Sequence, residues 1–195
     1  MRCDACDKKS CLNGMPCAPK PFPEAYADPW VKRTMRVASE IEAEFYGIKN
    51  RLEEVMEFAR RMEFRKLGLV FCLGLEEEAR IVGDILSREF ELESVCCKVG
   101  GFLKSEIGMA QGKGLGLASC NPAGQAAQLE RAGCDLAIVM GLCVGHDTVF
   151  YRTCSLPVTT LAVKDRVLGH NPLAAATCPY VRKKVIRGLR PREDE

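Results

Sequence analysis

Several features that commit a chain to one class of protein are scarce in this sequence. Basic and acidic residues nearly balance, with 28 Lys and Arg against 26 Asp and Glu, which argues against a dedicated binder of nucleic acid or anionic membranes. The longest apolar stretches, such as 136–145, fall far short of the roughly 20 residues that a membrane span needs. The first residues lack the apolar core of a secretory signal, so we expect a cytoplasmic protein.

Histidine is also scarce, with only 2 residues, whereas cysteine is abundant, with 12 in a chain of 195 residues. Thiols stay reduced in the cytoplasm, and disulfides are rare there. So many cysteines therefore predict metal or thiol chemistry and not a disulfide framework. The rest of the composition, 47% hydrophobic and 28% charged, is typical of a folded globular protein.

Apolar runs alternate along the chain with segments of helical periodicity. We expect strands at 66–72, 94–99, 135–141 and 157–163. We expect helices from 29 to about 45, at 50–62 and 76–90, from 122 to about 132, and from about 147. This alternation predicts an α/β fold, a three-layer sandwich with a mainly parallel sheet of four or slightly more strands, Rossmann- or flavodoxin-like. It occupies 29–195 and follows a cysteine-rich metal-binding segment, 1–28.

The N-terminal segment carries four cysteines in the pattern C-x2-C-x4-C-x5-C, namely Cys3, Cys6, Cys11 and Cys17. Four thiolates around one centre suit a tetrahedral zinc ion or an iron–sulfur cluster. The segment has almost no aliphatic residues, so a bound metal would supply the folding energy that it lacks. Four unrelated free thiols on a tail are the plainer alternative.

Both metals fit this quartet, and the spacing favours iron–sulfur. Zinc ribbons use two separated C-x2-C pairs, whereas this segment has one such pair and a compact run of four cysteines. A compact run is more typical of a [4Fe–4S] cluster, although no proline follows the last cysteine as it does in ferredoxins.

A second set of candidate residues follows the predicted strands. In open α/β sheets, ligands bind beyond the carboxyl ends of the strands, so these side chains are expected to meet at one edge. The cofactor-binding candidates are Cys72, Cys97, Cys120, Cys143 and His146. The catalytic candidates are Cys97, Cys120, Cys143, His146, Lys164, Asp165 and His170.

Each member of this second set has an ordinary structural alternative. Cys72 ends a buried strand and could serve as a small core residue, and one of Cys96 and Cys97 is expected to face the core. His146 and Asp165 could be capping or turn residues. The hypothesis depends on the convergence of the set and not on one residue. The remaining cysteines, Cys134, Cys154 and Cys178, are interpreted as packing residues.

Six motifs resemble those of a family of unknown function from anaerobic prokaryotes, whose members are described as candidate metal-binding proteins. The motifs are the N-terminal CDAC cluster, FCLGLEEEA (71–79), CCKVGGF (96–102), SCNPAGQA (119–126), GLCVGHD (141–147) and VKDRVLGHNPLAA (163–175). The resemblance spans nearly the whole chain. It implies metal binding and a cysteine-rich α/β domain, and it implies no particular reaction.

Two functions therefore remain open. The first is a cytoplasmic iron–sulfur protein with a redox or electron-transfer role and a redox partner protein, which has a second Cys/His site at the carboxyl edge of the sheet. The alternative is a zinc protein in which the N-terminal ion is structural and the sheet edge binds a small ligand or performs thiol chemistry. Neither function calls for nucleic acid or a membrane.

Overall fold

The structure, a computed structural model, describes residues 2–17, 23–110 and 116–188, and the chain divides into two compact units, Met1–Tyr46 and Gly47–Glu195. The first unit contains the 3-10 turns η1 (Cys3–Ala5), η2 (Ser10–Asn13) and η3 (Pro23–Ala27), followed by the long helix α1 (Pro29–Phe45). Asp28 caps α1 by accepting hydrogen bonds from the N–H groups of Trp30 and Val31, as expected from its place before a proline. The segment boundary after residue 28 stays a prediction, and its residues 18–22 lie outside the described residues.

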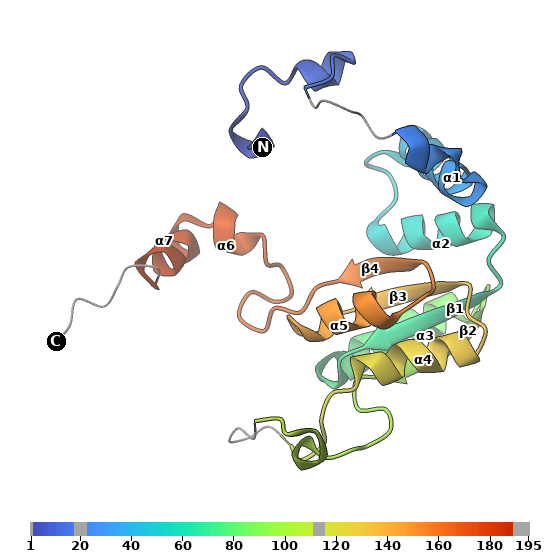
Figure 1. Cartoon of the computed structure of the whole chain (residues 1–195), viewed down its shortest axis with the longest axis vertical. Helices are drawn as coiled ribbons and strands as arrows, with labels where there is room; N and C mark the ends of the chain where they lie inside the picture. The colour runs from blue at the N-terminus through green and yellow to red at the C-terminus, as the bar shows by residue number, and fades with distance from the viewer. Residues whose placement is uncertain (1, 18–22, 111–115, 189–195) are drawn as a thin grey trace. The chain divides into compact units, whose positions relative to one another are not determined.

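The second unit holds a four-stranded, all-parallel sheet in the order β2-β1-β3-β4 (Figure 1). Its strands are β1 (Lys66–Phe71), β2 (Glu91–Cys96), β3 (Leu136–Met140) and β4 (Val158–Ala162). Its helices are α2 (Arg51–Met62), α3 (Glu76–Leu86), α4 (Pro122–Arg131), α5 (His146–Thr153), α6 (Ala174–Thr177) and α7 (Pro179–Gly188). The predicted α/β class with a parallel sheet is confirmed.

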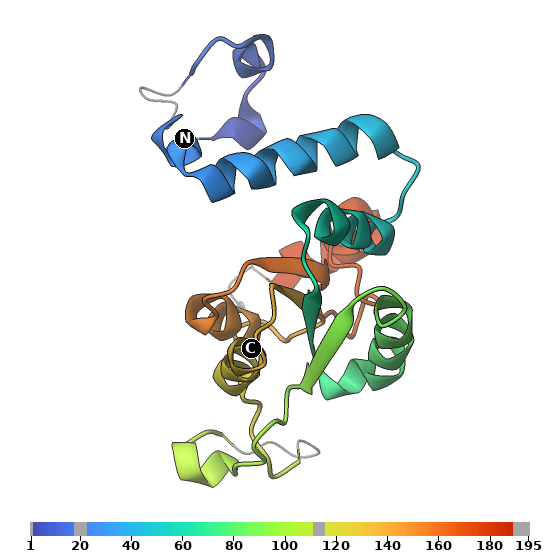
Figure 2. The same ribbon diagram turned by 90° about the vertical axis from the view of Figure 1, so that its right-hand side faces the viewer.

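Helices cover both faces of the sheet, because alternate strand residues point to opposite sides. Leu67 and Leu69 of β1 pack in a cluster with α2 and α3, whereas Val70 packs in a second cluster with α4 and with Phe150 of α5. Figure 2 shows α4 and α5 on one side of the sheet and α3 on the other. The sheet therefore has one buried hydrophobic core on each of its two faces.

One strand differs in position from the prediction. β2 runs from Glu91 to Cys96 and not from 94 to 99, because residues 97–100 form a turn. β2 is an edge strand, so Glu91 and Glu93 can belong to it without being buried. Because these residues are polar, the pattern of apolar residues placed the start of the strand too late. The helix α3 ends at Leu86, four residues before the predicted end. Within the described residues, no helix has the length and apolar character to cross a membrane.

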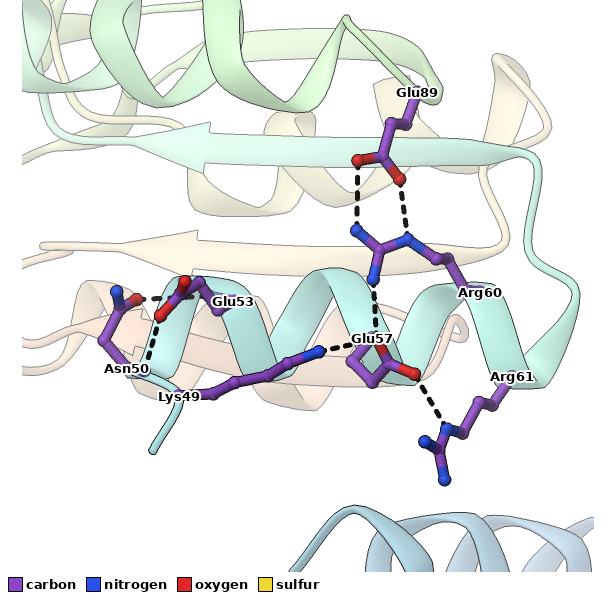
Figure 3. Close-up of polar contacts among 7 residues, drawn as sticks. All are labelled: Lys49, Asn50, Glu53, Glu57, Arg60, Arg61 and Glu89. Atoms are coloured by element: carbon purple, nitrogen blue, oxygen red, sulfur yellow. Dashed lines mark hydrogen bonds and ion pairs between the residues drawn. The ribbon is translucent and has the colours of Figure 1, made fainter. Parts of the chain in front are cut away.

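Helix α2 is held at its start and along its exposed side by polar contacts (Figure 3). The expected capping box is present: the side chain of Asn50 accepts from the N–H groups of Leu52 and Glu53, and the Glu53 carboxylate accepts from the Asn50 N–H at 2.8 Å. Further along, Glu57 forms ion pairs of 2.8 Å with Lys49, 2.6 Å with Arg60 and 2.8 Å with Arg61.

The Glu57 network predicts a pH dependence of stability. Hydrogen bonds from Lys49 and then Arg61 lower the pKa of Glu57 from its ordinary 4.5 to about 2. The stabilisation is therefore complete above pH 4.5 and is lost as the pH falls towards 2. We expect Glu57→Gln to lower the free energy of unfolding at pH 7 by about 1 kcal/mol, since the network is partly solvated. In urea unfolding, this difference should shrink at pH 3.

The matched control for this prediction is Glu54→Gln. Glu54 lies on the same helix and forms no ion pair with the described residues. We expect its effect to be smaller than that of Glu57→Gln at pH 7, since it removes only one acidic group from the first turn of the helix. An equal loss at pH 7 and pH 3 for Glu57→Gln would contradict the assigned role.

Candidate functional site

The thiols that follow the strands lie at one edge of the sheet, because all four strands run parallel and end there. Cys72 comes directly after β1 and Cys97 directly after β2, and Cys143 follows β3 in the loop before α5. Cys120 precedes Asn121, which caps α4. Four separate segments of the chain thus carry one thiol each to this edge, which we call the sheet-edge thiols.

Cys72 and Cys97 are buried and hydrogen-bonded to each other through their side chains. The turn η4 (Leu73–Leu75) directs its backbone N–H groups at both sulfurs: Leu73 donates to Cys97 Sγ at 3.4 Å, and Gly74 donates to Cys72. Lys164 also donates to Cys72. A Cβ on Gly74 would lie 3.0 Å from Lys164 Nζ, so the glycine leaves the space that the ammonium group occupies.

These contacts assign different proton states to the two thiols. The hydrogen bond from Cys97, the Gly74 N–H and the charge of Lys164 together outweigh burial and lower the pKa of Cys72 to about 4. The hydrogen bond to Cys72, followed by burial, raises the pKa of Cys97. Cys72 is therefore the thiolate that accepts, and Cys97 is the thiol that donates.

Cys120 is the third thiol near this pair. Its Sγ accepts a hydrogen bond from Lys98 Nζ at 3.4 Å, and the same ammonium donates to the Ala118 carbonyl at 2.8 Å. The Asn121 N–H donates to the Cys97 carbonyl at 2.8 Å, which ties the start of α4 to the turn after β2. Cys120 makes a minor electrostatic contribution to the raised pKa of Cys97, so Cys120 lies within electrostatic reach of Cys97.

Cys143 is the fourth thiol, and it is half-buried beside Arg166. The Arg166 guanidinium donates to Cys143 Sγ at 3.1 Å, and this contact raises the pKa of Arg166. Smaller electrostatic contributions to that pKa come from Cys72 and Cys120. Arg166 therefore lies within electrostatic reach of three of the sheet-edge thiols.

Three cations, Lys98, Lys164 and Arg166, accompany the four sulfurs. None of the three forms an ion pair with a carboxylate among residues 2–17, 23–110 and 116–188. Positive charge beside sulfur favours the thiolate, which is the form that binds metals and attacks electrophiles. The sheet edge is thus an electropositive site for anionic sulfur.

The other predicted catalytic candidates have local structural contacts. Asp165 accepts hydrogen bonds from the N–H groups of Val167 and Leu168, and its own N–H donates to His170 Nδ1 at 3.1 Å. His170 has a positive φ of 64° and donates its backbone N–H to the Asp165 carbonyl. Asp165 and His170 therefore close the turn that presents Arg166. His146 is half-buried and is the first residue of α5.

The N-terminal quartet is arranged differently. Cys3, Cys6, Cys11 and Cys17 are all exposed free thiols. Cys3 is the first residue of the turn η1, Cys6 directly follows that turn, and Cys11 lies in η2. Within the part of the chain that the structure describes, no three His, Cys, Asp or Glu side chains lie close enough together to hold a metal ion. Metal ligation by the quartet stays a prediction.

Three residues of the site, Lys98, Arg166 and Gln125, were not among the predicted candidates. Arg166 had one available signal, its position beside Lys164 and Asp165 after the fourth predicted strand. Gln125 is fully buried on α4, and its Nε2 donates to the carbonyls of Phe71 at 3.2 Å and Val95 at 2.8 Å. Its position on the apolar face of the helix predicted from residue 122 could have identified Gln125 as a buried polar residue. It joins the ends of β1 and β2 just before Cys72 and Cys97.

Comparisons with known proteins give one family and one close relative. Residues 18–161 match the family described as "Protein of unknown function (DUF1847)". The uncharacterized protein MJ0455 of Methanocaldococcus jannaschii is 44% identical over 193 residues, which are 96% of this chain and 100% of that protein. The crystal structure of Dph2 from Pyrococcus horikoshii with a 4Fe-4S cluster aligns with 69% of this chain and 33% of Dph2, at 15% identity and a TM-score of 0.37. That likeness is too slight to support an argument.

Proposed function

Because this chain belongs to the DUF1847 family, whose function is unknown, we propose its function from its own residues: it binds a metal centre through the sheet-edge thiols. One observation carries the proposal. Thiols from four separate segments, Cys72, Cys97, Cys120 and Cys143, lie at one edge of the sheet with three cations that form no ion pair with a described carboxylate. No three described ligand side chains lie within metal-binding distance of one another, so ligation requires these sulfurs to move together.

The chemistry of these donors fits a metal–thiolate centre. A zinc ion or an iron–sulfur cluster held by three or four thiolates carries net negative charge, which Lys98, Lys164 and Arg166 would offset. Hydrogen bonds to the sulfurs, such as that from the Leu73 N–H, are the contacts that tune iron–sulfur reduction potentials. Ligation requires the hydrogen-bonded pair Cys72 and Cys97 to release its shared proton and both sulfurs to turn to the metal.

Within metal binding, the proposal is an iron–sulfur protein with a redox or electron-transfer role. The compact N-terminal quartet, Cys3, Cys6, Cys11 and Cys17, would hold a second centre. A reducing compartment such as the cytoplasm would keep all twelve cysteines available as ligands. A bound cluster would supply the one-electron chemistry, and the chain's own contribution is to hold the sulfurs, exclude water from Cys72 and Cys97, and offset the charge.

A redox role also needs a surface for a partner protein. Val144 is 91% exposed and neighbours Cys143, and Val167 is 82% exposed and neighbours Arg166. Small apolar contacts around a charged group suit the brief encounters of electron-transfer proteins. These two valines support the proposal of a partner protein that docks beside the outermost thiol.

The test is the metal content and absorption spectrum of the full chain purified without oxygen. We expect a brown protein with a broad visible absorption band and with iron and acid-labile sulfide bound to the chain. A fourfold variant, Cys3→Ser with Cys6→Ser, Cys11→Ser and Cys17→Ser, should lose part of the iron and keep the sheet-edge centre. A colourless protein with no iron, zinc or other metal would overturn the proposal.

Zinc is the second candidate metal, because four thiolates with no histidine also satisfy a structural zinc site. A colourless protein with stoichiometric zinc that the fourfold variant loses completely would favour a structural N-terminal ion. The sheet edge would then be a small-ligand or thiol-chemistry site, and metal binding there would be rejected.

A further inference from the structure

Cys72 and Cys97 occupy neighbouring positions on adjacent strands. The register of β1 and β2 ends with Phe71 opposite Cys96, so the next two residues are Cys72 and Cys97. Adjacent strands lie about 4.8 Å apart. That spacing falls within the roughly 4.4–6.8 Å between Cα atoms that a disulfide needs.

The two side chains also point to the same side of the sheet. Both belong to the buried cluster that includes Val70, Val95 and α4, and the two thiols share a hydrogen bond. Cys96 precedes Cys97 on the strand and lies outside that cluster, because successive strand residues face opposite ways. The pairing is therefore specific to Cys72 and Cys97.

We propose that Cys72 and Cys97 form a reversible disulfide when the metal-free protein meets a peroxide. Two thiols and one hydrogen peroxide molecule give one disulfide and two water molecules. The S–S bond forms, and the O–O bond and the S–H bond of Cys97 break. The peroxide oxygens receive the two electrons, the proton of Cys97 and, because Cys72 is a thiolate, a second proton from solvent. A dithiol reductant reverses the change and becomes a disulfide itself.

Burial selects the oxidant. Cys72 is 7% exposed and Cys97 is 4% exposed, so peroxide, which is little larger than water, reaches the sulfurs faster than a bulky disulfide or dithiol does. The oxidised pair has no thiolate to offer a metal, so oxidation would remove two of the four sheet-edge ligands. The inference goes beyond the proposed function and holds for the metal-free chain whether or not that function is correct.

The test uses the full chain, reduced and freed of metal with a chelator, and then exposed to one equivalent of hydrogen peroxide. The denatured protein is alkylated, digested and analysed by mass spectrometry. We expect a peptide pair joined through Cys72 and Cys97 as the dominant disulfide, and we expect dithiothreitol to abolish it. Cys97→Ser should prevent the link, whereas Cys96→Ser, one residue away on the opposite face, should leave it unchanged.

Two results would overturn the inference. One is recovery of Cys72 and Cys97 as alkylated thiols while other cysteines are oxidised. The other is a dominant link from either residue to Cys120 or to another cysteine. Wild-type protein alone decides between these outcomes, so a poorly folded Cys97→Ser variant leaves the test intact. Absence of metal from the untreated protein would reject the proposed function and leave the disulfide result standing.

Discussion

Replacing Cys72 with alanine is expected to remove the metal bound at the sheet edge. Cys72 receives hydrogen bonds from Cys97, from the Gly74 N–H and from Lys164, which makes it the thiolate of the site. Loss of an outer hydrogen-bonding partner already costs a metal site about 10–100-fold in affinity, so loss of a direct ligand should exceed about 100-fold. Metal per chain after anaerobic desalting measures the effect, and the visible band should weaken in parallel.

The matched control is Cys134→Ala. Cys134 is 4% exposed and belongs to the same buried cluster as Cys72, but it precedes β3 and so lies at the amino end of the strands. Both variants should lose similar packing energy, and only the variant at Cys72 should lose metal. Equal metal loss in the two variants would indicate a general effect of core damage and would reject Cys72 as a ligand.

The second large effect is expected from Gly141→Ala, which alters the loop that carries Cys143. Gly141 follows β3 with a φ of 68°, a conformation that costs an L-residue about 1–2 kcal/mol. A Cβ there would also overlap the side chain of Leu75, which is buried in the core. Overpacking of this kind costs about 1–3 kcal/mol, so we expect a total loss of about 2–5 kcal/mol in the free energy of unfolding. Urea unfolding measures it.

Gly133→Ala separates the two causes. Gly133 has a φ of 69°, nearly the same as Gly141, but a Cβ there would meet no atom within 4 Å. Its loss should be limited to the cost of the left-handed backbone conformation, about 1–2 kcal/mol. If both variants lose the same free energy of unfolding, the overlap between a Cβ at position 141 and Leu75 costs nothing. The loop after β3 would then not be tightly packed against Leu75.

Most helices and strands were predicted well, because helix caps and continuous apolar runs depend on residues that are close together in the sequence. Asp28, Asn50 and Asn121 stand at the starts of α1, α2 and α4, and each side chain accepts backbone hydrogen bonds there. The buried strands β1 and β3 were predicted within one or two residues, since strands covered on both faces are continuously apolar. β2 was shifted because an edge strand tolerates glutamates, and edge position is a property of the whole sheet.

The sequence predicted the part of the site that follows from the order and direction of the strands. Parallel strands bring residues after each strand to one edge, which is why Cys72, Cys97 and Cys143 could be named from sequence. The contact between Arg166 and Cys143 depends on the path of two loops, and no pattern in either segment encodes it. The local roles of Asp165 and His170 in one turn likewise depend on a left-handed conformation at His170.

The most direct test of the central claim is a crystal structure of the anaerobically purified protein, with anomalous scattering recorded at the iron and zinc absorption edges. The account predicts an anomalous peak at the carboxyl edge of the sheet, bound by Sγ atoms of the sheet-edge thiols Cys72, Cys97, Cys120 and Cys143, with Lys98, Lys164 and Arg166 around it. Anomalous density confined to the N-terminal quartet, with the sheet-edge thiols still hydrogen-bonded to one another, would contradict it.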